Sequence, residues 1–179
     1  ASSYVGSSIR GILRSLAKES NDLQHIVEAL NVEMVKNLSE IYYFSTMVLC
    51  QLNVRTGIMH IVSAGHPPCF YYDAMKDEFT RVMNTGPLVG LIPGARFDQE
   101  TIELKMGDCF FMYTDGIVEA PSEMGGEMYG EDRLFSFFQS NITRPSMDIV
   151  HTLLGTVYEY TGYQSMQDDV TVICIKRIG

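Results

Sequence analysis

The sequence predicts an α+β fold in which antiparallel sheet is covered by helices. Helical periodicity is confined to residues 4–38 and 131–161, whereas β-branched and aromatic runs separated by turn residues fill the region between them. One alternating segment follows the last helix. Because helices and strands are segregated along the chain, the order excludes a doubly wound parallel sheet, in which they would alternate.

Two amphipathic helices are expected at the start. Asn21, with Gln24 three residues later, is typical of the beginning of a helix and separates the two. Each helix has apolar side chains spaced three and four residues apart: Tyr4, Val5, Ile9, Ile12, Leu13 and Leu16 in the first, and Ile26, Val27, Leu30, Met34 and Leu38 in the second. The pattern predicts a helical pair joined by a short polar turn.

Six strands are expected in the middle of the chain, at residues 42–54, 58–63, 69–72, 79–82, 97–104 and 109–114. Turn residues at 55–57 and 73–76 indicate two hairpins, and residues 105–108 indicate a third, between the last two strands. A Gly- and Pro-rich loop at 86–94 interrupts the series. Antiparallel pairing follows from these short connections.

After residue 115 we expect a Gly- and Met-rich loop, a helix over 131–140, a second helix over 146–161 that follows Pro145, and a closing strand over 169–178. The sequence contains neither an internal repeat nor a linker, so residues 1–179 are expected to form one domain. The eleven methionines and the three phenylalanines at 135, 137 and 138 are most simply core residues, with a partner-binding surface as the alternative.

Composition narrows the function classes. The chain has 179 residues, of which 46% are hydrophobic and 20% charged, and a net charge of -9. This charge disfavours nucleic acid and anionic membranes as partners, because both require basic patches. No apolar run is long enough to span a bilayer and no signal peptide is evident, so a cytoplasmic protein is expected. The four scattered cysteines indicate reduced core residues rather than a zinc site.

Two acidic clusters are the candidate chemical residues. Asp115 ends an apolar strand and is followed by Gly116, which lets the backbone turn at once, although an ordinary turn would look the same. Asp168 and Asp169 precede the closing strand, and because neighbouring side chains of an extended segment point in opposite directions, only one of them can join Asp115. The alternative is a solvated loop. Together the clusters suggest hard oxygen ligands for magnesium or manganese.

His66 is a weaker candidate. It lies among small residues and prolines between two strands, where it could act as a general acid or contact a phosphate. A turn histidine whose ring bonds the backbone is the more ordinary interpretation, because nothing in the sequence places a nucleophile near it.

The order of several short motifs resembles that of the PPM-type metal-dependent serine/threonine phosphatases, in particular their SpoIIE/RsbU-like bacterial branch. The motifs are FSTM at 44–47, SAGHPP at 63–68, GPLVGL at 86–91, GD at 107–108, YTDGIVEA at 113–120, YGEDRL at 129–134 and QDDVTVI at 167–173. The resemblance implies two packed antiparallel β-sheets flanked by helices, and a site for two Mn²⁺ or Mg²⁺ ions. It implies that Asp115 and Asp168 are metal ligands with a catalytic role. The expected metal-binding region also includes Gly116, Glu119 and Asp169. Glu119 matches an acidic position that lies near an additional metal in some relatives, and Asp169 is expected to be a structural neighbour of Asp168.

The implied reaction is in-line attack of water on a phosphoserine or phosphothreonine, with the cations lowering the pKa of the water and neutralising the phosphate. The implied substrate is a phosphoprotein, of the anti-sigma-factor antagonist type, and a sensor or regulatory domain is expected upstream. The family's GDxxGHG motif, which supplies further metal ligands, is missing from the sequence. We therefore expect a C-terminal portion of the phosphatase domain that lacks the N-terminal strands, has an incomplete metal site and is inactive alone.

Two further expectations follow from this truncation. Missing edge strands would leave backbone groups unpaired, which would favour a homodimer. The alternative function is a non-catalytic module that has the phosphatase fold and serves binding or signalling, which would apply if the missing motif was never encoded.

Overall fold

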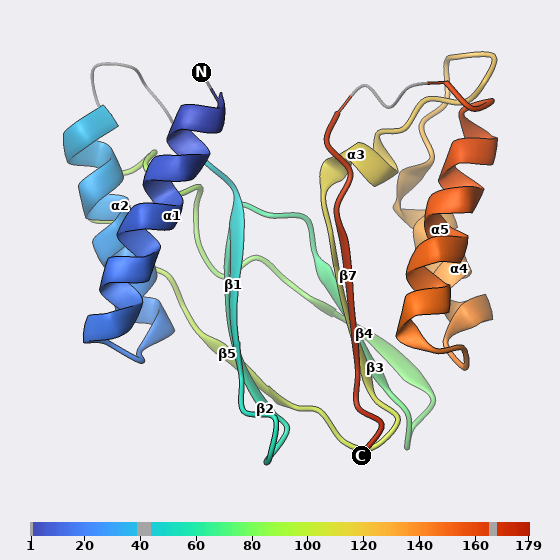
Figure 1. Ribbon diagram of the computed structural model, residues 1–179, viewed down its shortest axis with the longest axis horizontal. Helices are drawn as coiled ribbons and strands as arrows, with labels where there is room; N and C mark the ends of the chain where they lie inside the picture. The colour runs from blue at the N-terminus through green and yellow to red at the C-terminus, as the bar shows by residue number, and fades with distance from the viewer. Residues whose placement is uncertain (1, 39–43, 165–167) are drawn as a thin grey trace. The chain divides into compact units, whose positions relative to one another are not determined.

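The computed structural model describes residues 2–38, 44–164 and 168–179, which form two compact units. The first unit comprises Ala1–His66 and Met83–Glu103, and the second comprises Pro67–Val82 and Leu104–Gly179. Each unit contains one antiparallel sheet with helices beside it (Figure 1). The predicted α+β class, with antiparallel sheets flanked by helices, is confirmed.

The first unit contains α1 (Ser2–Glu19), α2 (Leu23–Leu38) and a sheet in the order β1 (Met47–Leu52), β2 (Ile58–Ala64), β5 (Glu100–Glu103). The residues of α2 that repeat every three or four positions are buried, as the apolar pattern predicted. They form a core with sheet and loop residues: Leu23, Ile26, Val27, Leu30, Met34, Val62, Ala64, Val89 and Phe97. Burial of this stripe, rather than helix propensity, holds a helix of this length in place.

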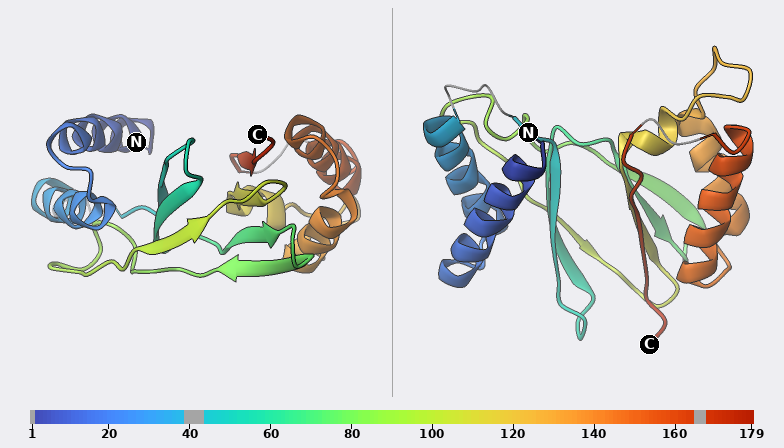
Figure 2. Two further views of the ribbon diagram at one scale, coloured as in Figure 1. Left: turned by 90° about the horizontal axis from the view of Figure 1, so that it is seen from below. Right: turned by 45° about the horizontal axis from the view of Figure 1, so that its top comes forward.

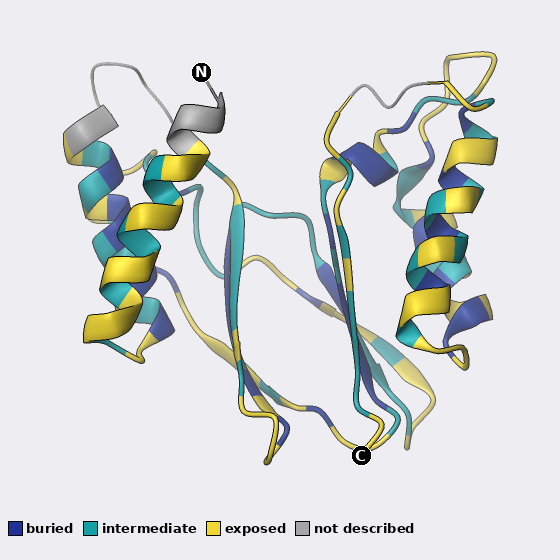
Figure 3. Cartoon of the chain, in the orientation of Figure 1, coloured by how far each residue is buried: buried dark blue, intermediate teal, exposed yellow. Residues whose placement is uncertain are grey.

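The second unit contains a sheet in the order β4 (Glu78–Val82), β3 (Cys69–Asp73), β6 (Cys109–Tyr113), β7 (Val172–Lys176), together with α3 (Asp115–Val118), α4 (Gly130–Asn141) and α5 (Ser146–Tyr160). Helix α5 buries Ile149, Leu153 and Val157 at intervals of four residues, and buried and exposed stretches alternate along it in Figure 3. Phe138 of α4 stacks on Phe111 of β6, with ring centroids 4.0 Å apart. These contacts join the helices to the sheet.

Asp108 sets the position of β6. Its side chain is fully buried, and its carboxylate accepts hydrogen bonds from the Tyr71 hydroxyl (2.7 Å), the Ala74 amide (2.8 Å) and the Lys105 amide (2.7 Å). A buried carboxylate is costly unless donors surround it, and here three do. The Asp108 carbonyl also accepts the Arg177 amide at 3.0 Å. The start of β6 is thereby tied to β3 and to the end of β7.

The first two predicted hairpins are confirmed: β1 pairs with β2, and β3 pairs with β4. The third is wrong. β5 pairs with β2 in one sheet, whereas β6 pairs with β3 and β7 in the other. The turn at Lys105–Asp108 forms, with the Asp108 amide bonded to the Lys105 carbonyl at 3.0 Å and Gly107 at φ 89°, but it carries the chain from one sheet to the other. The same turn residues suit a hairpin and a connection between two sheets, so they could not show which of the two forms.

The other differences are small. The strand expected at 97–104 is limited to Glu100–Glu103, and the strand expected at 169–178 to Val172–Lys176. The four-residue helix α3 replaces part of the expected loop after residue 115. The predicted strand residues 42–43 and the motif residue Gln167 lie outside the described residues. Within the described ranges, no helix is both long and apolar enough to cross a membrane.

Candidate metal site

Asp115 lies where β6 gives way to α3. Tyr113, the last residue of β6, pairs with Val172 of β7, and Thr114 is the extended N-cap residue of α3, with φ -89° and ψ 156°. Asp115 is the first residue of the helix, and its side chain is exposed. One of its carboxylate oxygens accepts the Gly116 amide at 3.1 Å, and its carbonyl accepts the Glu119 amide at 2.8 Å. The carboxylate is therefore held at the end of a buried strand.

Thr114 joins this turn to the segment that precedes β7. Its hydroxyl donates to the Asp169 carbonyl at 3.0 Å and accepts the Thr171 amide at 2.8 Å. Its own amide donates to the Thr171 carbonyl at 3.0 Å. The side chain and backbone of Thr114 thus link segments that lie 55 or more positions apart along the chain. The two acidic clusters found in the sequence lie side by side as a result.

Gly116 allows the close approach of these segments. A Cβ atom at this position would lie 2.6 Å from the Asp169 carbonyl oxygen and 3.3 Å from the Val170 Cγ2 atom. Real Cβ atoms essentially never lie within 3.0 Å of another heavy atom of this kind. The backbone does turn directly after β6, from strand into α3, but Gly116 is not among the glycines with a positive φ, so conformational freedom does not explain why glycine is needed here. It is needed because a side chain would collide with the backbone of Asp169.

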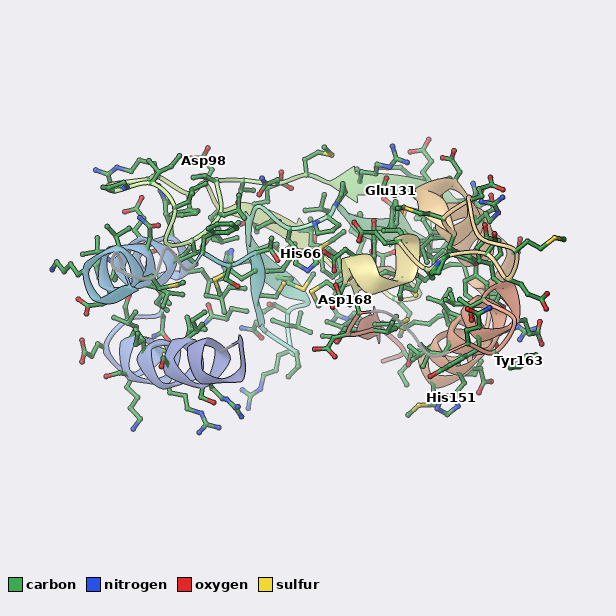
Figure 4. All side chains as sticks on the ribbon, turned by 90° about the horizontal axis from the view of Figure 1, so that it is seen from above. His66, Asp98, Glu131, His151, Tyr163 and Asp168 are labelled. Carbon is green, nitrogen blue, oxygen red and sulfur yellow. The ribbon has the colours of Figure 1, made fainter. Side chains whose placement is uncertain are left out.

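Asp168 and Glu119 line one small hollow, of about 60 Å³, together with Gly116, Ala120 and Pro121. Both acidic side chains are exposed, and Figure 4 labels Asp168 beside α3. One Asp168 carboxylate oxygen accepts the Asp169 amide at 2.7 Å. Asp115 immediately precedes the hollow's Gly116, and Asp169 contributes its carbonyl to the Thr114 contact. All five residues expected in the metal-binding region therefore come from two adjoining segments.

Tyr113, the residue before Thr114, belongs to the buried core next to the candidate site. Its ring is stacked on Phe70, with centroids 5.9 Å apart, and its side chain is 2% exposed. Burial raises the pKa of Tyr113, and the nearby Glu131 carboxylate adds to the effect. Within the described residues its hydroxyl has no hydrogen-bond partner. The residue before Thr114 is thus a neutral part of the core, not a charged part of the site.

His66 lies in the first unit, two residues after the end of β2. The preceding Gly65 has φ 63°, and its amide donates to the Gly86 carbonyl at 3.0 Å and to the Asn84 side chain at 2.8 Å. These contacts agree with a turn at this motif. A role for His66 as a general acid or a phosphate contact stays a prediction.

The donor chemistry of the hollow suits a hard divalent cation, because carboxylate oxygens are the ligands that Mg²⁺ and Mn²⁺ prefer. Among residues 2–38, 44–164 and 168–179, however, no three His, Cys, Asp or Glu side chains are grouped closely enough to hold a metal ion. The residues present therefore fit part of a metal site. The link that Thr114 makes between the two segments was not predicted, although both motifs contain a threonine, at 114 and 171.

The model of the family described as Stage II sporulation protein E (SpoIIE) matches residues 1–178. The phosphoserine phosphatase RsbU of Bacillus subtilis is 23% identical over 171 residues, which are 96% of this chain and 50% of RsbU. Protein IcfG of Synechocystis is 27% identical over 137 residues, which are 75% of this chain and 21% of IcfG. The chain thus spans half or less of these curated relatives.

Three solved structures share the fold. The SiaA-PP2C domain of Pseudomonas aeruginosa has a TM-score of 0.81 and 18% identity, covering 94% of this chain and 67% of that one. The RsbU and RsbW domains of Rv1364c from Mycobacterium tuberculosis have a TM-score of 0.74 and 25% identity, covering 96% and 46%. The Mn-presoaked phosphatase domain of SpoIIE from Bacillus subtilis has a TM-score of 0.64 and 20% identity, covering 95% and 73%.

Proposed function

This chain belongs to the SpoIIE family, and we propose on that basis that it is part of a metal-dependent protein serine/threonine phosphatase. The observation that carries the proposal is the contact between α3 and residues 168–171. Thr114 and Gly116 bring the segment containing Asp168 against the turn that carries Asp115. A family likeness alone does not fix a site, and this contact supports the proposal because it joins the two segments that carry Asp115 and Asp168.

In the proposed site Asp115 and Asp168 hold Mn²⁺ or Mg²⁺. When bound, the cations would neutralise phosphate charge and lower the pKa of the attacking water. The chain's own residues position the ligands: Thr114 orders the backbone on both sides, and Gly116 leaves room for it. Glu119, on the wall of the same hollow as Asp168, is the candidate for a further carboxylate contact.

The proposed substrate is a regulatory protein phosphorylated on serine or threonine, of the anti-sigma-factor antagonist type. Support comes from membership of the family and from the likeness to RsbU, a protein described as a phosphoserine phosphatase. We also propose that a sensor or regulatory domain belongs to the same polypeptide, because the curated relatives are at least twice as long as the matched region. Cytoplasmic location and dimerisation stay predictions.

Residues 1–179 alone are proposed to be inactive or nearly so. The part of the chain that the structure describes gathers no three metal-ligating side chains, and octahedral coordination needs more donors than Asp115 and Asp168 supply. The same observation favours the alternative function, a non-catalytic module that binds a partner through the phosphatase fold. The complete reading frame distinguishes the two, because a GDxxGHG motif before residue 1 is required for the enzyme only.

The test is to assay the product of the complete reading frame with MnCl₂ on p-nitrophenyl phosphate and on phosphoserine peptides. Asp115→Asn and Asp168→Asn should each lower kcat/KM by about 100-fold or more, because each removes a charged ligand. The matched control is Asp148→Asn, an exposed aspartate in the first turn of α5, which should retain full activity. Unchanged activity in Asp115→Asn would show that the metal assignment is wrong.

A further inference from the structure

Residues 121–128, here called the methionine hairpin, lie next to the candidate site. Pro121, which lines the hollow beside Asp168, forms an antiparallel bridge with Met128. The Ser122 amide donates to the Glu127 carbonyl at 2.8 Å, closing the hairpin. The right-hand view of Figure 2 shows it as a gold loop that projects beyond the end of α5. The proposed function assigns no role to this element.

The base of the hairpin is firmly held. Arg133 donates to the Met128 carbonyl (3.1 Å), to the Tyr129 carbonyl (3.0 Å) and to the Glu127 carboxylate (2.9 Å). Its guanidinium lies 5.1 Å from the centroid of the Tyr160 ring. The Tyr160 hydroxyl donates to the Glu127 and Met128 carbonyls, and its own carbonyl accepts the Glu123 amide at 3.0 Å. This many polar contacts order a loop that buries little apolar surface.

The hairpin nevertheless presents its methionines to solvent. The side chain of Met124 is 97% exposed and that of Met128 is 59% exposed. Single exposed apolar residues are normal, so exposure alone would mean little. Here two flexible thioether side chains stand on an anchored backbone that adjoins a candidate active site, and methionine adapts well to varied partners.

The charge around the hairpin indicates what would cover it. Residues 119–133 contain five acidic side chains, Glu119, Glu123, Glu127, Glu131 and Asp132, and one basic side chain, Arg133. Arg133 is bonded to Glu127, and Glu131 is paired with Arg81 of β4 at 3.6 Å, so the acidic excess comes from Glu119, Glu123 and Asp132. The surface therefore repels acidic polypeptides and favours a segment that carries apolar and basic residues.

We propose that the methionine hairpin is a docking surface for the polypeptide that flanks the phosphorylated residue of the substrate. An apolar side chain of that polypeptide packs on Met124 and Met128, and a basic one lies near Glu123. This proposal rests on the proposed phosphatase function, since it needs a phosphoprotein at the adjoining hollow. It makes the hairpin a determinant of substrate choice that takes no part in the chemistry.

The test compares three substrates with the product of the complete reading frame: a phosphoserine peptide flanked by leucine and lysine, one flanked by glycine and serine, and p-nitrophenyl phosphate. The measured quantity is the ratio of kcat/KM for the leucine-lysine peptide to kcat/KM for p-nitrophenyl phosphate. In the double variant Met124→Ser with Met128→Ser, this ratio should fall about 10-fold, because KM for the peptide rises. Glu123→Gln should lower the preference for the leucine-lysine peptide over the glycine-serine peptide about 3-fold.

The control variant is Met75→Ser. Met75 is 82% exposed, in the turn between β3 and β4, at the opposite end of β6 from Asp115, and its replacement should leave all three rates unchanged. An unchanged ratio in the double variant, with hydrolysis of all substrates retained, would overturn the docking proposal and leave the phosphatase function standing. A wild-type protein that hydrolyses none of the three would overturn both.

Discussion

Replacing Gly116 with alanine should push the segment that carries Asp168 away from α3. The new methyl group would lie 2.6 Å from the Asp169 carbonyl oxygen, so it must move by at least several tenths of an ångström to reach ordinary contact. The obstacle is backbone rather than the flexible end of a side chain, and that backbone is held by the Thr114 hydroxyl at 3.0 Å. The strain therefore cannot be relieved by a rotamer change.

The expected magnitude combines opposing effects. Overpacking of a filled contact costs about 1–3 kcal/mol. Weakening the two hydrogen bonds of the Thr114 hydroxyl adds roughly 1 kcal/mol, since each contributes about 0.5–1.5 kcal/mol. Alanine in place of a helical glycine returns about 0.5–1 kcal/mol. The free energy of unfolding should therefore fall by about 1–3 kcal/mol, because the steric effect exceeds the gain in helix propensity.

Urea denaturation of residues 1–179 measures this change, with Gly155→Ala as the matched control. Gly155 lies inside α5 and is exposed, and a Cβ there would meet nothing within 4 Å. Its replacement should raise the free energy of unfolding by about 0.5–1 kcal/mol. The two variants thus differ in sign. If Gly116→Ala also stabilises the protein, the two segments do not approach as closely as described, and the structural basis of the site is wrong.

Three further predictions concern other contacts. Thr114→Val, which removes the hydroxyl and keeps the shape, should cost about 1–2 kcal/mol in urea denaturation, because the Asp169 carbonyl and the Thr171 amide lose their partner; no loss would show that water replaces the hydroxyl fully. Asp108→Asn should cost about 2–4 kcal/mol, because an amide group cannot accept all three donors that surround this buried carboxylate; a change below 0.5 kcal/mol would contradict this account. Burial raises the pKa of the Cys50 thiol to about 11, so alkylation by iodoacetamide at pH 8 should be ~100-fold slower than for an exposed cysteine and should rise steadily towards pH 11; a rate that levels off near pH 9 would refute it.

The helices could be predicted because their apolar spacing is a local property. Ile149, Leu153 and Val157 lie four residues apart, and this spacing requires one buried face whatever the helix packs against. The first two hairpins could be predicted for a similar reason, since their turn residues lie directly between the strands that pair. In both cases the residues that determine the structure are close neighbours in sequence.

The failures concern contacts between distant residues. The turn at Lys105–Asp108 would suit a hairpin, and only the pairing of β5 with β2 shows that the chain changes sheet there. The sequence indicated a turn residue at Gly116. The lack of a side chain there is explained instead by the Asp169 carbonyl, which lies more than fifty positions later in the chain. The family resemblance indicated that the two acidic segments meet, which periodicity and turn residues could not. The metal-binding roles of Asp115 and Asp168 stay predictions.

The order of the second sheet has a consequence for what a cation at the candidate site would do. β7 is the last strand of the series β4-β3-β6-β7, so on one side it has no neighbour among the described strands. Outer strands detach at a lower free energy than central ones. An ion bound by both Asp115 and Asp168 would act as a cross-link that closes a loop of more than fifty residues and holds this strand in place. Cation binding and local unfolding of β7 would then be coupled: each opening of the strand would release the ion, and each bound ion would suppress the opening.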